Sequence, residues 1–296
     1  MNKILAGSGI QDSSIKLKIV PESVSYSDAE IRDKLLQLDK TCCIVKNGDS
    51  VGACLKEDAD ESSSGSSMSL LAQAPPLKTT QLGDPEFIKF HGLKMAYMTG
   101  SMANGIASEN LVISSGKFGL LSSFGAAGLL PSIIEQAINN IQKALPEGPY
   151  AFNLIHSPSE DAIEKAAVDL YLKYRVRTVE ASAFLGLTPN IVRYRVAGLR
   201  RNSQNQVEIT NRVIAKISRA EVASKFMAPA PEDILNKLVE EKSITREQAE
   251  LATAVPMADD ITVEADSGGH TDNRPLVSLL PAIIACLLYT SPSPRD

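Results

Sequence analysis

Residues 261–270 read Ile-Thr-Val-Glu-Ala-Asp-Ser-Gly-Gly-His, an apolar run followed by a glycine pair and a histidine. The run from Ile261 to Ala265 is predicted to be a buried strand, and Gly268 and Gly269 would let the backbone after it approach a ligand closely. His270 then stands at the carboxyl end of this strand, where barrels of parallel strands carry out chemistry. His270 is therefore the candidate acid–base residue.

Five further apolar runs precede this strand, with helical patterns between them. The six candidate strands start 26, 30, 28, 35 and 48 residues apart, and the first four spacings match the roughly 31-residue repeat of a barrel of eight strand–helix units. The pattern predicts an α/β fold with a parallel sheet, either a barrel or an open doubly wound sheet. The predicted strands are 94–98, 120–123, 150–155, 178–181, 213–217 and 261–265.

The N-terminal part of the chain has a different texture. Residues 1–57 combine a helical pattern at 27–38 with two β-like runs, and the Asn47–Asp49 turn between these runs is a strong hairpin signal. This pattern predicts a small α+β region. Residues 58–81 are acidic, then rich in serine and proline, and are predicted to be a linker because such a composition buries little apolar surface.

The predicted barrel spans residues 82–285 and contains one unusually long connection. Residues 219–260 hold two or three helical patterns, which are either a lid or docking element or a plain helical decoration. Six strands are found where a closed barrel needs eight, so the units that usually build the phosphate site of such barrels are expected to be missing. Residues 286–296 differ in texture and are predicted to be a non-native tail.

Composition and charge exclude several classes of function. The formal charge is −5 and no basic stripe runs along the chain, which argues against nucleic acid as a partner. No signal peptide is visible, and the apolar stretch at 276–288 is too short and too interrupted to span a membrane, so a cytoplasmic location is expected. The four cysteines lack metal-ligand or redox spacing, so no metal site is predicted and buried thiols in a reducing compartment are expected.

Each predicted strand ends in small, glycine-rich or polar residues, as a flat cofactor lying across the mouth of a barrel requires. Residues 100–102 follow the first strand, Asn153 lies in the third, and Glu180 in the fourth. Lys216 lies inside the apolar fifth strand, where a buried ammonium group needs a partner, although a lysine at a strand end can also extend to solvent. His156, after the third strand, is expected to do no more than cap a helix.

Four strings of residues, taken in order, resemble the PfaD family. These proteins are the flavin-dependent enoyl reductases of bacterial polyunsaturated-fatty-acid synthases and of related trans-acting polyketide systems, within the nitronate monooxygenase (2-nitropropane dioxygenase) superfamily. The strings are Asn-Gly-Ile-Ala-Ser at 104–108, Ser-Phe-Gly-Ala-Ala-Gly-Leu at 123–129, Pro-Tyr-Ala-Phe-Asn-Leu-Ile-His-Ser-Pro at 149–158, and Asp-Asp-Ile-Thr-Val-Glu-Ala-Asp-Ser-Gly-Gly-His at 259–270.

The resemblance implies an aldolase-type TIM barrel that binds FMN, here with about six of its eight strand–helix units. It implies that residues 100–102 line the isoalloxazine ring, that Asn153 and Lys216 hydrogen-bond the flavin, and that Asp266 orients the glycine loop. His270 matches the active-site histidine of the family. The implied cofactor-binding residues are Gly100, Ser101, Met102, Asn153, Lys216, Asp266, Gly268 and Gly269.

The implied reaction uses NADPH, or NADH, to reduce FMN and then reduces a trans-2-enoyl thioester on an acyl carrier protein. His270 would either deliver the proton to the α-carbon or stabilise the enolate oxygen. Because the phosphate-binding units are expected to be missing, the chain by itself is expected to be an inactive fragment. Two alternatives are a nitronate monooxygenase-like flavoprotein and a non-catalytic module that docks acyl carrier protein through residues 219–260.

Overall fold

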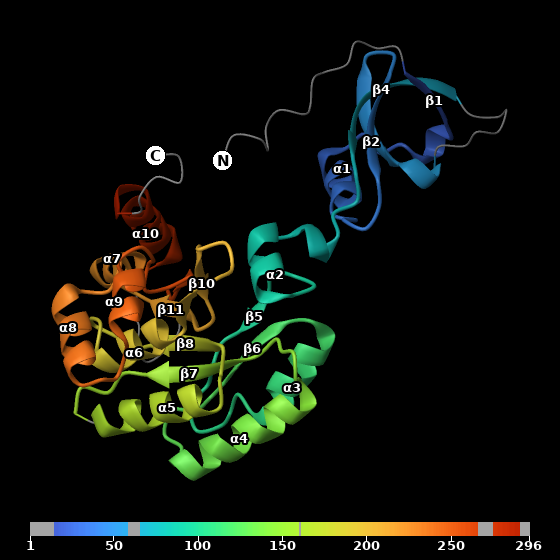
Figure 1. Ribbon diagram of the computed structural model, residues 1–296. Coiled ribbons are helices and arrows are strands. Elements are labelled where there is room, and N and C mark those ends of the chain that lie inside the picture. The colour runs from blue at the N-terminus through green and yellow to red at the C-terminus, as the bar shows by residue number, and fades with distance from the viewer. Residues whose placement is uncertain (1–14, 59–65, 160, 266–274, 291–296) are drawn as a thin grey trace. The chain divides into compact units, whose positions relative to one another are not determined.

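Figure 1 shows the computed structural model of the chain, which describes residues 15–58, 66–159, 161–265 and 275–290. The chain divides into two compact units, an N-terminal unit up to Gly83 and a barrel unit from Asp84 onward. In the described parts of the chain, no helix is long and apolar enough to cross a membrane.

The N-terminal unit is a four-stranded antiparallel sheet with one α-helix beside it. The order of its strands is β1-β4-β2-β3, and the helix α1 begins after Ser27, whose hydroxyl accepts the Glu30 N–H at 3.4 Å. The β2–β3 hairpin turns at Gly48, which has a positive φ of 60° that glycine adopts without strain. The elements are β1 (Lys16–Ile19), α1 (Asp28–Leu35), β2 (Cys42–Asn47), β3 (Ser50–Leu55) and β4 (Ser66–Ala74).

The linker predicted for residues 58–81 is wrong over much of its length, because β4 lies within it. This strand pairs with β1 on one side and β2 on the other, so it is an interior strand of the sheet. Met68 is fully buried in a small core with Ile19, Val45 and Cys54. The hydrogen bonds that pair β4 with its two neighbours are made by backbone groups and do not depend on side-chain type. A serine-rich segment can therefore form a strand when partners are present on both sides. The α+β region therefore extends at least to Ala74.

The barrel unit is built on a curled sheet of six parallel strands in the order β12-β11-β8-β7-β6-β5. Five of the six strands predicted from the sequence are present within a few residues, and the first, predicted at 94–98, is only the two-residue β5 at the end of that range. Neighbours in the sheet are consecutive along the barrel repeat, as a (β/α) barrel requires. The strands are β5 (Met98–Thr99), β6 (Leu121–Phe124), β7 (Ala151–Ile155), β8 (Thr178–Ser182), β11 (Arg212–Ile217) and β12 (Asp260–Val263).

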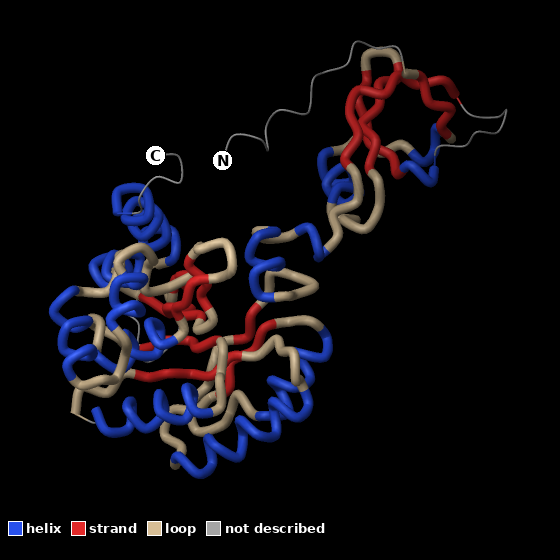
Figure 2. The backbone as a smooth tube through the Cα atoms, in the orientation of Figure 1, coloured by secondary structure: helices blue, strands red, loops and turns tan. Residues whose placement is uncertain are grey.

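Helices wrap the outer face of this sheet (Figure 2). Several begin at side-chain caps: Ser108, Thr188 and Thr245 each accept a backbone N–H from the first turn of their helix. The sequence did not predict the short antiparallel pair β9 (Leu199–Arg201) and β10 (Val207–Ile209). The helices are α2 (Pro85–His91), α3 (Glu109–Phe118), α4 (Pro131–Ala144), α5 (Asp161–Lys173), α6 (Pro189–Ala197), α7 (Ala220–Met227), α8 (Glu232–Glu240), α9 (Arg246–Ala252) and α10 (Leu276–Thr290).

The segment 219–260 belongs to this outer wall. Its helices α7, α8 and α9 bury Phe226, Leu235 and Leu251 in the main core, and α8 and α9 pack against α6. The segment is therefore packed into the barrel unit through all three of its helices. The predicted tail at 286–296 begins inside α10, which continues to Thr290, and residues 291–296 lie outside the described residues.

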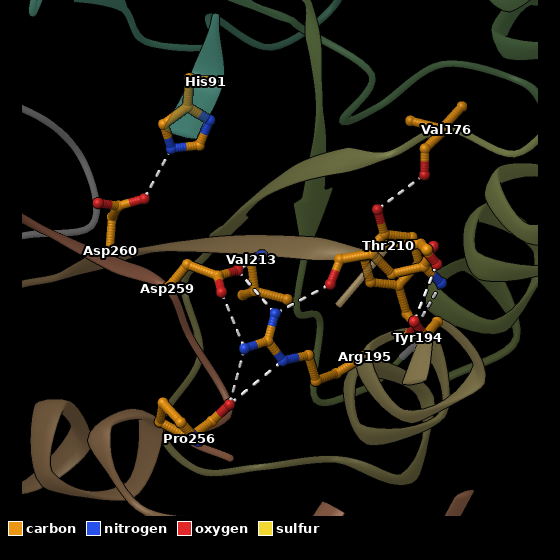
Figure 3. A network of polar contacts seen from close by, with 11 residues as sticks. His91, Val176, Tyr194, Arg195, Thr210, Val213, Pro256, Asp259 and Asp260 are labelled. Atoms are coloured by element: carbon orange, nitrogen blue, oxygen red, sulfur yellow. Dashed lines mark hydrogen bonds and ion pairs between the residues drawn. The ribbon is translucent and has the colours of Figure 1, made fainter. Parts of the chain in front are cut away.

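A buried polar network closes the N-terminal end of the sheet (Figure 3). Arg195 of α6 binds both carboxylate oxygens of Asp259, at 2.7 and 2.9 Å, and donates to the carbonyl oxygens of Pro256 and Asn211. Asp259 also accepts the N–H of Val213 at 2.9 Å. The network ties α6 to the starts of β11 and β12, and the guanidinium is only 1% exposed.

Candidate functional site

The inner face of the curled sheet carries an apolar layer and, above it, a polar one. Side chains alternate along each strand, so Val213, Ala215 and Ile217 pack outward against the helices while Ile214 and Lys216 face inward. Toward the N-terminal ends of the strands, the inward residues form an apolar plug made of Leu93, Leu121, Ala151 and Ile214. One step toward the C-terminal ends, the inward residues are Asn153, Glu180 and Lys216.

Glu180 is the hub of this polar layer. Its Oε2 accepts the backbone N–H of Ser101 at 2.8 Å, and its Oε1 lies 3.6 Å from the Nζ of Lys216. The carboxylate is 2% exposed, so both contacts are made away from bulk water, where they are stronger than on the surface. Glu180 thus joins the loop after β5 to strand β11 across the interior of the sheet.

Lys216 is held between two carboxylates, Glu180 at 3.6 Å and Glu264 at 3.8 Å, and its side chain is 15% exposed. Pairing, and not extension to solvent, therefore accounts for a lysine inside this strand. Lys216 and Glu264 also line a cavity of about 170 Å³ at the C-terminal ends of β8 and β11, together with Phe184. The ammonium group lies at the end of the sheet where barrel enzymes bind their substrates.

Asn153 is fixed by hydrogen bonds within the polar layer. Its side-chain Nδ2 donates to the backbone carbonyl oxygen of Glu180 at 3.2 Å and to Ser182 Oγ at 2.9 Å. The backbone carbonyl oxygen of Asn153 accepts the Tyr171 hydroxyl at 2.6 Å. The side chain is 4% exposed. Its orientation is therefore set before any ligand binds.

The loops after β5 and β6 interlock over the strand ends. Gly105 N–H donates to the Gly125 carbonyl oxygen at 2.9 Å, and Met102 O lies so close to Gly125 that an added Cβ would come within 1.7 Å of it. Gly125 is therefore required for this close approach. At Gly100, an added Cβ would lie 3.4 Å from Glu180 Oε1, so the loop backbone passes directly over the carboxylate. Met102 is 46% exposed at the rim.

One further inward residue supplies an unused polar group. The hydroxyl of Ser123 is fully buried and has no hydrogen-bond partner among the described residues. A buried polar group normally has a partner, so an orphan one points to a ligand or a water. An amide, a hydroxyl, an ammonium group and a glycine-lined backbone together fit a flat ring that carries carbonyl and nitrogen groups. In the described parts of the chain, no group of three acidic, histidine or cysteine side chains could hold a metal ion.

The remaining predicted residues, Asp266, Gly268, Gly269 and His270, lie outside the described residues. Their placement stays a prediction, supported by the strand that leads to them: Glu264 N–H donates to Ile217 O at 2.9 Å, so the end of β12 lies beside the end of β11.

The other two histidines have structural partners. His156 Nδ1 lies 2.8 Å from Glu164 Oε2, and its ring stacks on Phe184 at 5.3 Å, which ties the end of β7 to α5. His91 Nε2 lies 2.8 Å from Asp260 Oδ2 at the opposite end of the sheet (Figure 3). Neither histidine reaches the polar layer through these contacts.

Comparison with known proteins gives the family. Residues 20–76 match the model of the fatty acid synthase subunit PfaD N-terminal domain. A polyunsaturated fatty acid synthase subunit of a Thraustochytrium species is 47% identical over 273 residues, which are 90% of this chain and 18% of that protein. The polyketide biosynthesis protein PksE of Bacillus subtilis is 48% identical over 203 residues, which are 68% of this chain and 26% of that protein.

A solved structure agrees with these relatives. The enoyl reductase domain of MlnA, from the macrolactin biosynthesis cluster of Bacillus amyloliquefaciens, is 38% identical with a TM-score of 0.67, over 70% of this chain and 47% of that one. The chain thus spans less than half the length of that domain and about a quarter or less of its curated relatives. The match of the N-terminal domain, the identity to the two biosynthetic relatives and the likeness of the barrel unit to the MlnA domain all agree with the resemblance seen in the sequence strings. The chain belongs to the PfaD family.

Proposed function

We propose that this chain contributes to an FMN-dependent enoyl reductase that acts on trans-2-enoyl thioesters of acyl carrier protein, in polyunsaturated-fatty-acid or polyketide biosynthesis. The observation that carries the proposal is the likeness in sequence and fold to the enoyl reductase domain of MlnA. The names of the curated relatives, a polyunsaturated fatty acid synthase subunit and a polyketide biosynthesis protein, support the same pathway class.

The polar layer provides the groups that would hold the cofactor. Asn153 and Lys216 offer hydrogen bonds, the buried Ser123 hydroxyl offers an unused one, and Gly100 lets backbone come close. When bound, FMN supplies hydride transfer between a reduced nicotinamide and the conjugated double bond. The ammonium group of Lys216 stabilises negative charge on a neighbouring group, and Glu180 acts as a positioning residue that fixes both this ammonium and the Ser101 backbone.

The reaction is tested by rapid mixing in a protein in which this sequence is continued to the length of the MlnA domain. The flavin is first reduced by NADPH or NADH without oxygen, and a crotonyl thioester or an alkyl nitronate is then added. Reoxidation of the flavin by the crotonyl thioester, with formation of the saturated thioester, is expected. Turnover of the nitronate with an inert thioester would instead identify a nitronate-oxidising enzyme.

Replacing Glu180 by glutamine is expected to weaken FMN binding about tenfold, a cost of about 1.4 kcal/mol. The substitution keeps an acceptor for Ser101 N–H but removes the nearer of the two negative charges beside Lys216. Fluorescence titration of FMN in the continued protein measures the effect. The matched control is Glu264→Gln, which removes the farther and more exposed carboxylate and should cost less. Equal losses in the two variants would refute the hub role of Glu180.

Replacing His270 by alanine is expected to abolish enoyl reduction while FMN remains bound. The proposed role of His270 is to move a proton to the α-carbon or to hydrogen-bond the enolate oxygen, and removing a general acid typically costs about 10²–10⁴-fold in rate. The measurements are the visible spectrum of the bound flavin and the turnover of the crotonyl thioester. Turnover close to that of the parent enzyme would show that another group performs this step.

A further inference from the structure

The barrel unit has a second sizeable cavity, at the end of the sheet opposite the polar layer. It measures about 550 Å³ and lies between α2, the residues that follow α5, and the first residues of β8 and β11. Arg212 begins β11 and lines this cavity, whereas Lys216 lies four residues further along the same strand. Four residues of strand span about 13 Å, so the cavity is separate from the proposed flavin site.

Three arginines give this cavity its character. Arg175, Arg177 and Arg212 all line it, together with Lys89. The same three arginines also line an adjoining cavity of about 480 Å³, so they are reachable from both. We call these three residues and the space between them the arginine pocket.

The charge of the arginine pocket is not balanced by the protein. Among the described residues, no carboxylate forms an ion pair with Arg175, Arg177 or Arg212, and the Arg212 guanidinium lies over the ring of Phe90 at 4.3 Å. Glu147 is the acidic residue in the lining of the larger cavity. Burial lowers the pKa of Arg212, and the positive charge of Arg177 acts in the same direction, against the attraction of Asp259 and Asp260.

The acidic groups that act on Arg212 or line the adjoining cavity already have other partners. Asp259 binds Arg195, Asp260 binds His91, and Glu208 binds Arg200. These pairings leave three guanidinium groups facing one cavity, with a single lining carboxylate. With Lys89 also in the lining, the cavity has an excess of about three positive charges, which attracts a ligand with at least two negative charges.

We propose that the arginine pocket binds a small molecule that carries two or more phosphate groups. Guanidinium groups bind phosphate oxygens through paired, charge-assisted hydrogen bonds, and three of them suit a diphosphate better than a single carboxylate. The cavity volume lies within the range of about 300–1,000 Å³ typical of small-molecule sites. The ligand would act at a distance from the chemistry, because the apolar plug made of Leu93, Leu121, Ala151 and Ile214 separates the two ends of the sheet.

Isothermal titration of the chain with inorganic pyrophosphate at about 0.15 M salt, where exposed charges are largely screened, tests the proposal. Saturable binding to one site is expected, with weaker binding of inorganic phosphate. Arg177→Gln and Arg212→Gln should each weaken binding about tenfold or more, since each removes a charge-assisted pair. Arg201→Gln is the matched control: Arg201 is exposed, as Arg177 is, but it lines neither cavity, so this variant should leave binding unchanged.

Three further measurements complete the test. Urea unfolding of each variant checks that it folds as the parent does, and Arg177→Lys, which keeps the charge but loses the paired geometry, should bind between parent and Arg177→Gln. Titration with ADP separates two sources of the phosphate groups: tighter binding than pyrophosphate indicates a nucleotide, and equal binding indicates a phosphorylated compound without a base. Absence of saturable binding in the parent, or equal losses in Arg201→Gln and Arg177→Gln, overturns the proposal.

Discussion

Replacing Arg195 by alanine is expected to lower the free energy of unfolding by about 3–5 kcal/mol, or to prevent folding. The reason is that Asp259 would keep its buried charge while losing both of its guanidinium hydrogen bonds, and the carbonyl oxygens of Pro256 and Asn211 would lose their donor. Urea unfolding followed by circular dichroism measures the change.

The chain contains a matched control for this prediction. Arg200 forms the same two-pronged pair with Glu208, at 2.8 Å for both contacts, but on the surface with side chains 64% and 42% exposed. Arg200→Ala should therefore cost less than about 1 kcal/mol. The two ion pairs have the same geometry and differ in burial and in the two backbone carbonyl oxygens that Arg195 also binds. A similar loss for both would show that the Arg195 network is not what holds α6 to the sheet.

Replacing Phe226 by alanine is expected to cost about 3–5 kcal/mol of unfolding free energy, through lost burial and the cavity left behind. Phe226 of α7 is fully buried, and its ring lies edge-on to that of Phe184 at 5.8 Å. The prediction tests whether the segment 219–260 is part of the barrel wall. A decoration would unfold separately and would leave the main urea transition unchanged.

Phe118→Ala is the control for this second prediction. Phe118 ends α3 and is 61% exposed, so its truncation removes little buried area and should change stability by less than about 1 kcal/mol. Both variants delete the same atoms from a helix of the barrel unit. Comparable urea midpoints for Phe226→Ala and the parent would contradict the placement of α7 in the core.

The repeat of the barrel could be predicted from the sequence because its four central strands, β6, β7, β8 and β11, are short and almost entirely buried. The outer strands β5 and β12 hold no fully buried residue, so the burial expected for 261–265 is not reached. An apolar composition is a local property of a segment, as at 150–155 and 213–217, and can be read without knowing which strands pair with it. Strand β4 has no such signature. Only Met68 of its first four residues is apolar, and the strand exists because β1 and β2, distant in sequence, supply partners on both sides. Non-local pairing of this kind is not encoded in local composition.

The polar layer was predicted in part, because a lysine in an apolar strand needs a partner. This argument applies to Lys216, whereas the role of Asn153 is implied by the resemblance to the family. Both residues lie in one layer with Glu180. The central role of Glu180 was missed, although a carboxylate between Val179 and Ala181 carries the same signal as Lys216. The register of β8 against β11 could not be predicted from the sequence. This register sets Glu180 beside Ile214, so that Lys216, two residues further along β11, comes within reach of the Glu180 carboxylate.

The Arg195–Asp259 pair also has a consequence for how the chain is made. The two residues are 64 positions apart in the sequence. At about 5–20 residues per second, roughly 3–13 s of synthesis separate them. During that time, α6 carries a guanidinium whose carboxylate partner has not yet been made. Burying this charge unpaired is costly, which disfavours docking of α6 on the sheet. The speed of translation across residues 196–259 therefore sets how long the apolar face of α6 remains open to chaperones and to aggregation.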